Sequence, residues 1–237
     1  MLVALGLTAL RLALGDAMLR FVQPRMRIPL IVAAALLLFL GGATIVRAWR
    51  PTVGRDRDGA GSGPDHAAPG VGWLLIVPVA VLLLVSPAPL GADAAARSAV
   101  RTTKLPQAQN VTFDPLPLAV NGAVPLSLTA YSERALYDST ESLAGTTVRL
   151  IGFVVNSKDK PGEVYLTRFR IACCAADAFP VEVVLRGNVG KRKQDTWLEV
   201  TGTWRATVTS PDSDEFLRAE LDVKSVDVVG APGDPYE

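Results

Sequence analysis

The distribution of apolar residues divides the chain into two parts: long uninterrupted apolar runs come first, and short alternating runs follow. Residues 28–46 carry no charge over 19 positions, and residues 71–90 are also uncharged. At a rise of about 1.5 Å per residue, each run forms a helix long enough to cross a hydrocarbon core of roughly 30 Å. The pattern therefore predicts at least two transmembrane helices.

A third apolar run, over residues 2–22, is interrupted by Arg11, Asp16 and Arg20. Asp16 and Arg20 are four positions apart, so on one helix they share a face and can pair. One interpretation is an amphipathic or tilted helix whose polar residues Asp16 and Arg20 face a partner. The other is a polar functional site inside the membrane, which intramembrane ionisable residues often mark.

The alternating runs begin after a proline-rich stretch. Residues 1–98 are expected to form the membrane region, with spans at about 2–22, 28–46 and 71–90, and residues 99–125 a linker whose four prolines oppose helix formation. Residues 126–237 then read as a soluble domain that begins with a short helix, because apolar positions between residues 126 and 143 recur at helical spacing.

Five segments of the soluble domain have the β-branched composition and turn boundaries of strands. Gly152 and Gly202 lie inside two of them, where glycine indicates a kink or bulge. We therefore predict an α+β membrane protein: N-terminal transmembrane helices, two or three in number, followed by a small closed all-β barrel, OB-like, with a β-sandwich as the alternative. The predicted strands are residues 146–155, 163–172, 179–185, 196–208 and 216–229.

Charge supports the same division. The first 104 residues carry 11 Lys+Arg and 5 Asp+Glu, a net of +6, whereas residues 105–237 carry 13 and 18, a net of −5. The overall net charge of +1 gives no indication of a nucleic-acid partner, and two cysteines are too few for a disulfide scaffold. Basic residues flank the spans on both sides in similar number, so the positive-inside rule leaves the topology open.

Both cysteines are adjacent, at Cys173 and Cys174, with Asp177 shortly after them. Neighbouring thiols can bind one soft or transition metal ion if the strand breaks there, since on a strand they would point to opposite faces. Cys173 and Cys174 are thus candidate metal ligands and, with Asp177, a candidate substrate or metal site. The alternative is that one cysteine fills the barrel interior as a small hydrophobic residue.

Signals of catalysis are absent from the sequence. The chain has no phosphate-binding loop, GxSxG or HExxH motif, and its one histidine, His66, lies in the Gly/Pro-rich loop of residues 50–70. We therefore expect a protein that is not an enzyme and has no certain cofactor. Four ligands for a structural zinc are also lacking.

Several motifs nevertheless resemble those of a known family. The chain resembles the YcgQ-like family of two-component permease subunits, although Gln23 stands where that family often has histidine. The motifs are Phe21–Met26 (FVQPRM), Leu84–Gly91 (LVSPAPLG), Gly152–Val154 (GFV), Arg168–Ala178 (RFRIACCAADA) with Pro180 and Val181, and Trp197–Gly202 (WLEVTG).

The resemblance implies a multi-pass protein of the bacterial inner membrane that works beside a separately encoded permease. It implies an extracytoplasmic C-terminal domain and favours a functional role for Cys173, Cys174 and Asp177. We therefore expect an accessory permease subunit whose barrel binds a substrate or soft metal ion through the cysteine pair. The alternative is a non-catalytic, membrane-anchored assembly module with packed cysteines. In either case, the expected partners are the permease and the lipid bilayer.

Overall fold

The computed structural model describes residues 2–49, 88–98, 113–157, 160–206 and 218–237. The chain divides into two compact units. The helical unit comprises Met1–Met18 and Pro24–Ala88, and the barrel unit comprises Leu19–Gln23 and Pro89–Glu237. Two stretches of the expected 1–98 membrane region, Leu19–Gln23 and Pro89–Ser98, are thus grouped with the barrel. Most of the expected span 71–90 (residues 71–87), His66 and most of the 99–125 linker lie outside the described residues.

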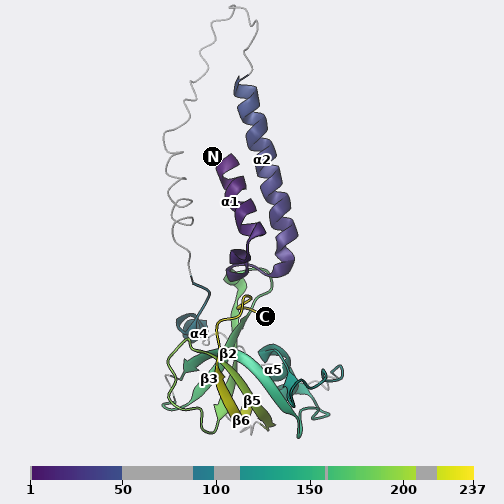
Figure 1. Cartoon of the computed structure of the whole chain (residues 1–237), viewed down its shortest axis with the longest axis vertical. Helices are drawn as coiled ribbons and strands as arrows, with labels where there is room; N and C mark the ends of the chain where they lie inside the picture. The colour runs from purple at the N-terminus through teal and green to yellow at the C-terminus, as the bar shows by residue number, and fades with distance from the viewer. Residues whose placement is uncertain (1, 50–87, 99–112, 158–159, 207–217) are drawn as a thin grey trace, which may run out of the picture. The chain divides into compact units, whose positions relative to one another are not determined.

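The helical unit contains α1 (Leu2–Leu14) and α2 (Arg27–Trp49), which lie side by side (Figure 1). Two 3-10 turns, η1 (Asp16–Arg20) and η2 (Pro24–Met26), separate them. Close contact depends on glycine, because a Cβ at Gly6 would come within 2.8 Å of the Leu38 side chain. Glycine lets the two helix backbones approach closely because it has no side chain at the contact.

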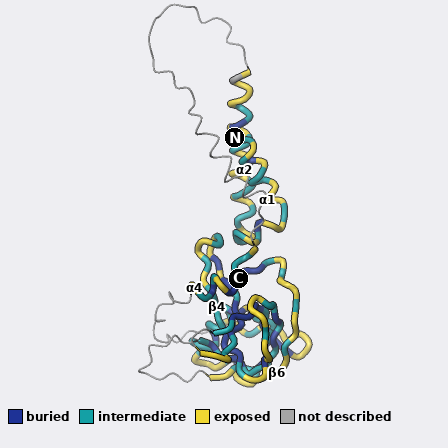
Figure 2. The backbone as a smooth tube through the Cα atoms, turned by 90° about the vertical axis from the view of Figure 1, so that its left-hand side faces the viewer, coloured by how far each residue is buried: buried dark blue, intermediate teal, exposed yellow. Residues whose placement is uncertain are grey.

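Only α2 is long and apolar enough to cross a membrane among the helices of the described residues. In Figure 2 the backbone of α2 is coloured mostly as exposed or intermediate. Its exposed apolar side chains include Ile28, Val32, Leu36, Phe39 and Trp49. The first apolar run does not form the expected continuous helix over 2–22. Instead, α1 ends at Leu14, since Gly15 and the 3-10 turn from Asp16 follow it, and its 13 residues are too few to span.

The barrel unit confirms the predicted small closed barrel of five strands. The strands join in the order β2-β3-β4-β6-β5, and β5 pairs back to β2, so the sheet closes on itself (Figure 1). All pairs in this circuit are antiparallel except β4 with β6. The strands are β2 (Thr147–Asn156), β3 (Val164–Arg170), β4 (Phe179–Arg186), β5 (Trp197–Arg205) and β6 (Ala219–Val228).

Gly202 marks the predicted irregularity. The β5–β6 register shifts between Thr201 and Gly202, and a Cβ at Gly202 would clash with the Asp222 carbonyl oxygen of β6. Gly152 serves a similar purpose, because a Cβ there would lie 2.7 Å from the Thr167 carbonyl oxygen. Both glycines allow neighbouring backbones to approach closely, as a tightly curved barrel requires.

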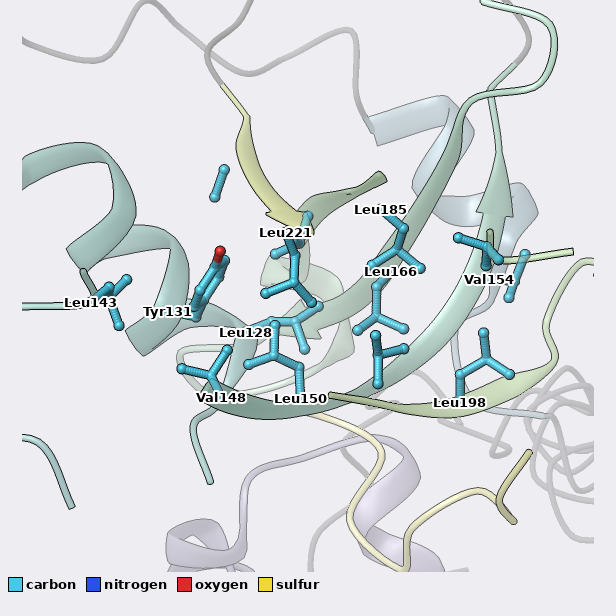
Figure 3. Packing of buried hydrophobic residues seen from close by; sticks show 14 residues of the cluster. Leu128, Tyr131, Leu143, Val148, Leu150, Val154, Leu166, Leu185, Leu198 and Leu221 are labelled. Atoms are coloured by element: carbon cyan, nitrogen blue, oxygen red, sulfur yellow. The ribbon is translucent and has the colours of Figure 1, made fainter. Parts of the chain in front are cut away.

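Leucine and valine side chains fill the barrel, and α5 (Leu128–Tyr137) packs against this core (Figure 3). This helix is the short helix expected between residues 126 and 143. Tyr131 of α5 is fully buried and donates its hydroxyl to the Glu220 carbonyl oxygen at 2.6 Å. The interior side chains labelled in Figure 3 include Val148, Leu150, Val154, Leu166, Leu185, Leu198 and Leu221.

A second core lies outside the barrel wall. There α4 (Ala92–Ser98) covers a group of aromatic and aliphatic side chains on β2, β3 and β4. Asp195 accepts a hydrogen bond from the Ala92 N–H at 2.6 Å and so holds the start of α4. A short strand that the sequence did not indicate, β1 (Val124–Pro125), pairs in parallel with β2. The covered side chains on these strands are Phe153, Val155, Tyr165, Phe169 and Val184, and Ile171, which directly follows β3, packs with them.

Candidate functional site

The two cysteines lie in the loop between β3 and β4. Strand β3 ends at Arg170, and the chain then turns through the 3-10 helix η5 (Ala175–Asp177) before β4 begins. Cys173 is exposed and Cys174 is half-buried, so neither fills the barrel interior. The break in the strand allows both sulfur atoms and an Asp177 carboxylate oxygen to lie within 4.8 Å of one another. The three residues expected to form one site are therefore brought together.

The Asp177 carboxylate fixes the backbone of this loop. One oxygen accepts a hydrogen bond from the Ala172 N–H at 2.8 Å. The other accepts from the N–H groups of Cys173, at 2.8 Å, and Cys174, at 3.4 Å. A carboxylate surrounded by backbone N–H groups forms charge-assisted hydrogen bonds, which are stronger than neutral ones. Asp177 thereby holds the peptide groups that precede both cysteines.

Hydrogen bonding also determines the protonation of the site. The bond from the Cys173 thiol to Asp177, with a further contribution from Cys174, raises the pKa of Cys173 to about 11. The same bond, aided by the backbone N–H groups, lowers the pKa of Asp177 to about 2. At neutral pH the site therefore holds a protonated Cys173 beside an ionised Asp177. A metal ion bound by Cys173 must displace the thiol proton.

A segment distant in sequence pairs with the thiol loop. Val22 and Cys174 form an antiparallel bridge. The Gln23 N–H donates to the Cys173 carbonyl oxygen at 3.1 Å, and the Ala175 N–H donates to the Phe21 carbonyl oxygen at 2.7 Å. The Gln23 side-chain amide donates to the Ile171 carbonyl oxygen. Sequence reasoning missed this pairing, since main-chain bonds leave no pattern of side chains to read.

Residues 234–237 support the same loop from β3. Glu237 accepts from the Ile171 N–H at 3.1 Å and donates its own N–H to Phe169 at 2.9 Å. Arg168 donates to the carbonyl oxygens of Asp234, at 2.7 Å, and Tyr236, at 3.2 Å. The backbone entering the thiol loop is thus fixed at its last strand residues.

Asp16 and Arg20 do not lie on one α-helical face, because η1 contains both. The described ion pair of Asp16 is with Arg27, at 3.4 Å, and the Asp16 side chain is 88% exposed. The Arg20 carbonyl oxygen accepts the Tyr236 hydroxyl at 2.9 Å. Neither residue belongs to the cluster formed by the cysteines and Asp177.

A hollow of about 530 Å³ lies at the other end of the β3–β4 pair. Its lining includes Val164 and Leu185, which are register partners, whereas the thiol loop joins Arg170 to Phe179. The loop that follows β4 contributes Lys191 and Arg192. The hollow is therefore separate from the thiol site. The thiol site is much smaller, since its three ligand atoms lie within 4.8 Å of one another, which is the size of an ion site.

The five barrel strands and the thiol loop lie within the region that matches a known domain family. Residues 126–237 match the family model of the DUF1980 C-terminal domain. The DUF1980 match covers α5, the five barrel strands and the residues Cys173, Cys174 and Asp177. It is consistent with the family resemblance seen in the C-terminal motifs of the sequence.

A comparison with curated proteins gives no match. Among solved structures, the chain is similar to a protein described as an aspartyl-tRNA synthetase from Leishmania major Friedlin. The identity is 15% and the TM-score 0.28, over 57% of this chain and 25% of that chain. At this TM-score the likeness carries no argument about fold or function.

Proposed function

We propose that the protein is an accessory subunit of a bacterial inner-membrane permease whose barrel captures a soft metal ion through Cys173 and Cys174. The observation that carries the proposal is the gathering of two sulfur atoms and one carboxylate oxygen within 4.8 Å on an accessible loop. The apolar helix α2 supports membrane attachment. The resemblance to the YcgQ-like family supports a separately encoded permease as the partner and an extracytoplasmic barrel.

The chemistry of the site favours soft ions. Thiolates select Cu(I), Zn²⁺ and other soft or borderline ions over hard cations such as Mg²⁺. Two thiolates and one carboxylate also leave a tetrahedral ion one position short, and a closed structural zinc site needs about four protein ligands. An incomplete set on an exposed loop suits an ion that is received and passed on. The partner permease would supply the next ligand.

The barrel itself suits a binding role. We take it to be OB-like, on the basis of its five strands, the parallel pair β4–β6 and the helix α5 that packs against its core. Barrels of this kind present loops at their ends for binding. The thiol loop between β3 and β4 is one of these loops.

Metal titration of the full chain in detergent micelles tests the proposal. With both thiols reduced, Cd²⁺ should bind one ion per chain and produce thiolate-to-metal charge-transfer absorption. Cys173→Ser with Cys174→Ser should abolish the signal. Asp227→Asn, which removes an exposed carboxylate on β6, should leave it unchanged. Equal Cd²⁺ affinity in the wild type and the double serine variant would refute metal capture by the thiols.

Thiol labelling separates this function from that of an assembly module with packed cysteines. Because Cys173 is exposed and Cys174 half-buried, we expect a maleimide to react in the native state. A membrane-impermeant maleimide should label intact cells if the barrel is extracytoplasmic. Thiols that react only after unfolding would favour the assembly module, and labelling only in permeabilised cells would place the barrel in the cytoplasm.

A further inference from the structure

The backbone around Cys174 is held from outside the loop. The peptide group between Cys173 and Cys174 carries the carbonyl oxygen that accepts from the Gln23 N–H at 3.1 Å. The next peptide group, between Cys174 and Ala175, carries the N–H that donates to Phe21 at 2.7 Å. Both peptide planes that flank Cys174 are therefore fixed by Leu19–Gln23, which we call the clasp.

The clasp is itself anchored to the barrel unit. The Tyr236 hydroxyl donates to the Arg20 carbonyl oxygen at 2.9 Å and accepts from the Leu90 N–H at 3.2 Å. Tyr236 is only 4% exposed, and it packs with the outer core of the barrel. The bonds between clasp and loop thus start from a segment that has a fixed position. In sequence, the clasp continues through Pro24–Met26 directly into α2.

Adjacent residues need such support to act on one ion. Cys174 has extended backbone angles, φ −153° and ψ 169°, and successive side chains of an extended chain point to opposite sides. The two sulfur atoms nevertheless lie within 4.8 Å of each other. Asp177 holds the peptide groups before each cysteine, and the clasp holds those on both sides of Cys174. The arrangement of the thiols depends on both.

We propose that the clasp is a positioning segment for the thiol site and is coupled to its occupancy. This inference rests on the proposed function, because it requires an ion bound by Cys173 and Cys174. A clasp that holds the thiols ready lowers the ordering cost of binding and so raises affinity. By linkage, the bound ion stabilises the pairing between clasp and loop by the same factor. Occupancy is thereby communicated to the segment that leads into α2.

The substitution Ala175→Pro separates the clasp from the loop with little other change. Ala175 is the first residue of η5, where proline is tolerated because its missing N–H has no partner within the helix. The extended angles of Cys174 suit a residue that precedes proline. Proline removes the N–H that bonds to Phe21, and its ring Cδ takes the place of that hydrogen. Because the Phe21 carbonyl oxygen lies 2.7 Å from the Ala175 nitrogen, the Cδ displaces the clasp from the loop. The displacement also weakens the neighbouring bond from the Gln23 N–H to Cys173. Ala175→Ser retains that N–H and serves as the matched control.

Two measurements on the full chain in micelles test the coupling. Cd²⁺ should slow hydrogen exchange at the Gln23 amide of the wild type and of Ala175→Ser. Ala175→Pro should weaken Cd²⁺ binding about three- to tenfold, as expected for one lost hydrogen bond, and should abolish the slowing at Gln23. Should Ala175→Pro fail to fold, Gln23→Ala provides the test, since it removes only the side-chain bond to Ile171 and should also weaken binding.

Two results would overturn the coupling while leaving the proposed function intact. One is Cd²⁺ binding to the wild type without any change in Gln23 exchange. The other is binding to Ala175→Pro with wild-type affinity. A wild type that binds no Cd²⁺ would instead overturn the proposed function, and the coupling with it.

Discussion

Asp177 is the residue on which the geometry of the thiol loop depends most directly. Its two carboxylate oxygens accept three consecutive backbone N–H groups, from Ala172 to Cys174, and its negative charge suits that arrangement. The side chain that sequence reasoning selected as a third ligand is therefore also the internal support of the loop.

We predict that Asp177→Asn loosens the loop without unfolding the barrel. An asparagine offers one acceptor oxygen, and its NH₂ group would face backbone N–H donors that it cannot accept from. Hydrogen exchange at the Cys173 and Cys174 amides should become faster. Asp227→Asn makes the same chemical change on β6 and should leave both amides unchanged. Unaltered exchange in Asp177→Asn would show that the carboxylate does not hold the loop.

Asp138, which follows α5, makes the barrel sensitive to acid. Hydrogen bonds from Ser142 and Thr140 hold the pKa of the Asp138 carboxyl well below its usual value. A depressed folded pKa contributes stability above the unfolded value of about 3.9, and that contribution is lost as the pH falls through the folded pKa.

We therefore predict that Asp138→Asn destabilises the barrel at pH 7 and has a smaller effect at pH 3. Denaturant unfolding of the full chain, followed by tryptophan fluorescence, measures the difference in the free energy of unfolding at each pH. The effect at pH 7 should be modest because the carboxylate is exposed to solvent. If the wild type and Asp138→Asn differed in free energy of unfolding as much at pH 3 as at pH 7, the effect would not come from the lowered pKa of the Asp138 carboxyl.

At the scale of elements, the strands of the barrel were predictable because their segments are rich in β-branched and aromatic residues and are bounded by turn residues. The five observed strands lie within about three residues of the predicted ranges at most boundaries. The end of α1 at Leu14 could not be predicted from apolarity, because the apolar run continues to residue 22. Gly15 ends α1 at Leu14, and a break of this kind depends on local backbone bonds rather than on hydrophobic periodicity.

Gly202 lies at the register shift in β5, and its substitution tests why a glycine is needed there. A Cβ at this position would clash with the β6 backbone at Asp222, so we predict that Gly202→Ala lowers the free energy of unfolding by about 1–3 kcal/mol. Gly230→Ala is the matched control, because a Cβ there would meet nothing within 4 Å. Thermal or denaturant unfolding of the two variants measures the contrast. An equal loss of unfolding free energy in both variants would show that glycine at position 202 is not required for the close approach of the β5 and β6 backbones.

At the scale of the whole molecule, the barrel unit is joined by contacts between residues far apart in sequence. The sequence placed Cys173, Cys174 and Asp177 in one site because they are neighbours along the chain. It could not place Leu19–Gln23 or residues 234–237 beside that site, because these contacts are made mainly by backbone atoms and single polar groups. Extended structure before Pro24 was the one available indication.

Glu237 contacts both α5 and the end of β3. Its carboxylate accepts the Leu128 and Thr129 N–H groups at the start of α5, each at 2.8 Å. It also lies 3.9 Å from the Arg168 guanidinium, and both side chains are largely buried, with exposures of 8% for Glu237 and 16% for Arg168. A negative charge at a helix N-terminus is favourable, and burial limits screening by solvent.

We predict that Glu237→Gln lowers the free energy of unfolding by about 1–3 kcal/mol, since a neutral amide leaves Arg168 without its carboxylate and weakens the hold on α5. Glu141→Gln, at an exposed turn, should change stability by less than about 0.5 kcal/mol. Because Glu237 also pairs with the strand that enters the thiol loop, Glu237→Gln should speed exchange at the Ile171 amide. If Glu237→Gln lost stability but exchange at the Ile171 amide were unchanged, the Glu237 side chain would support α5 and not the strand that enters the thiol loop.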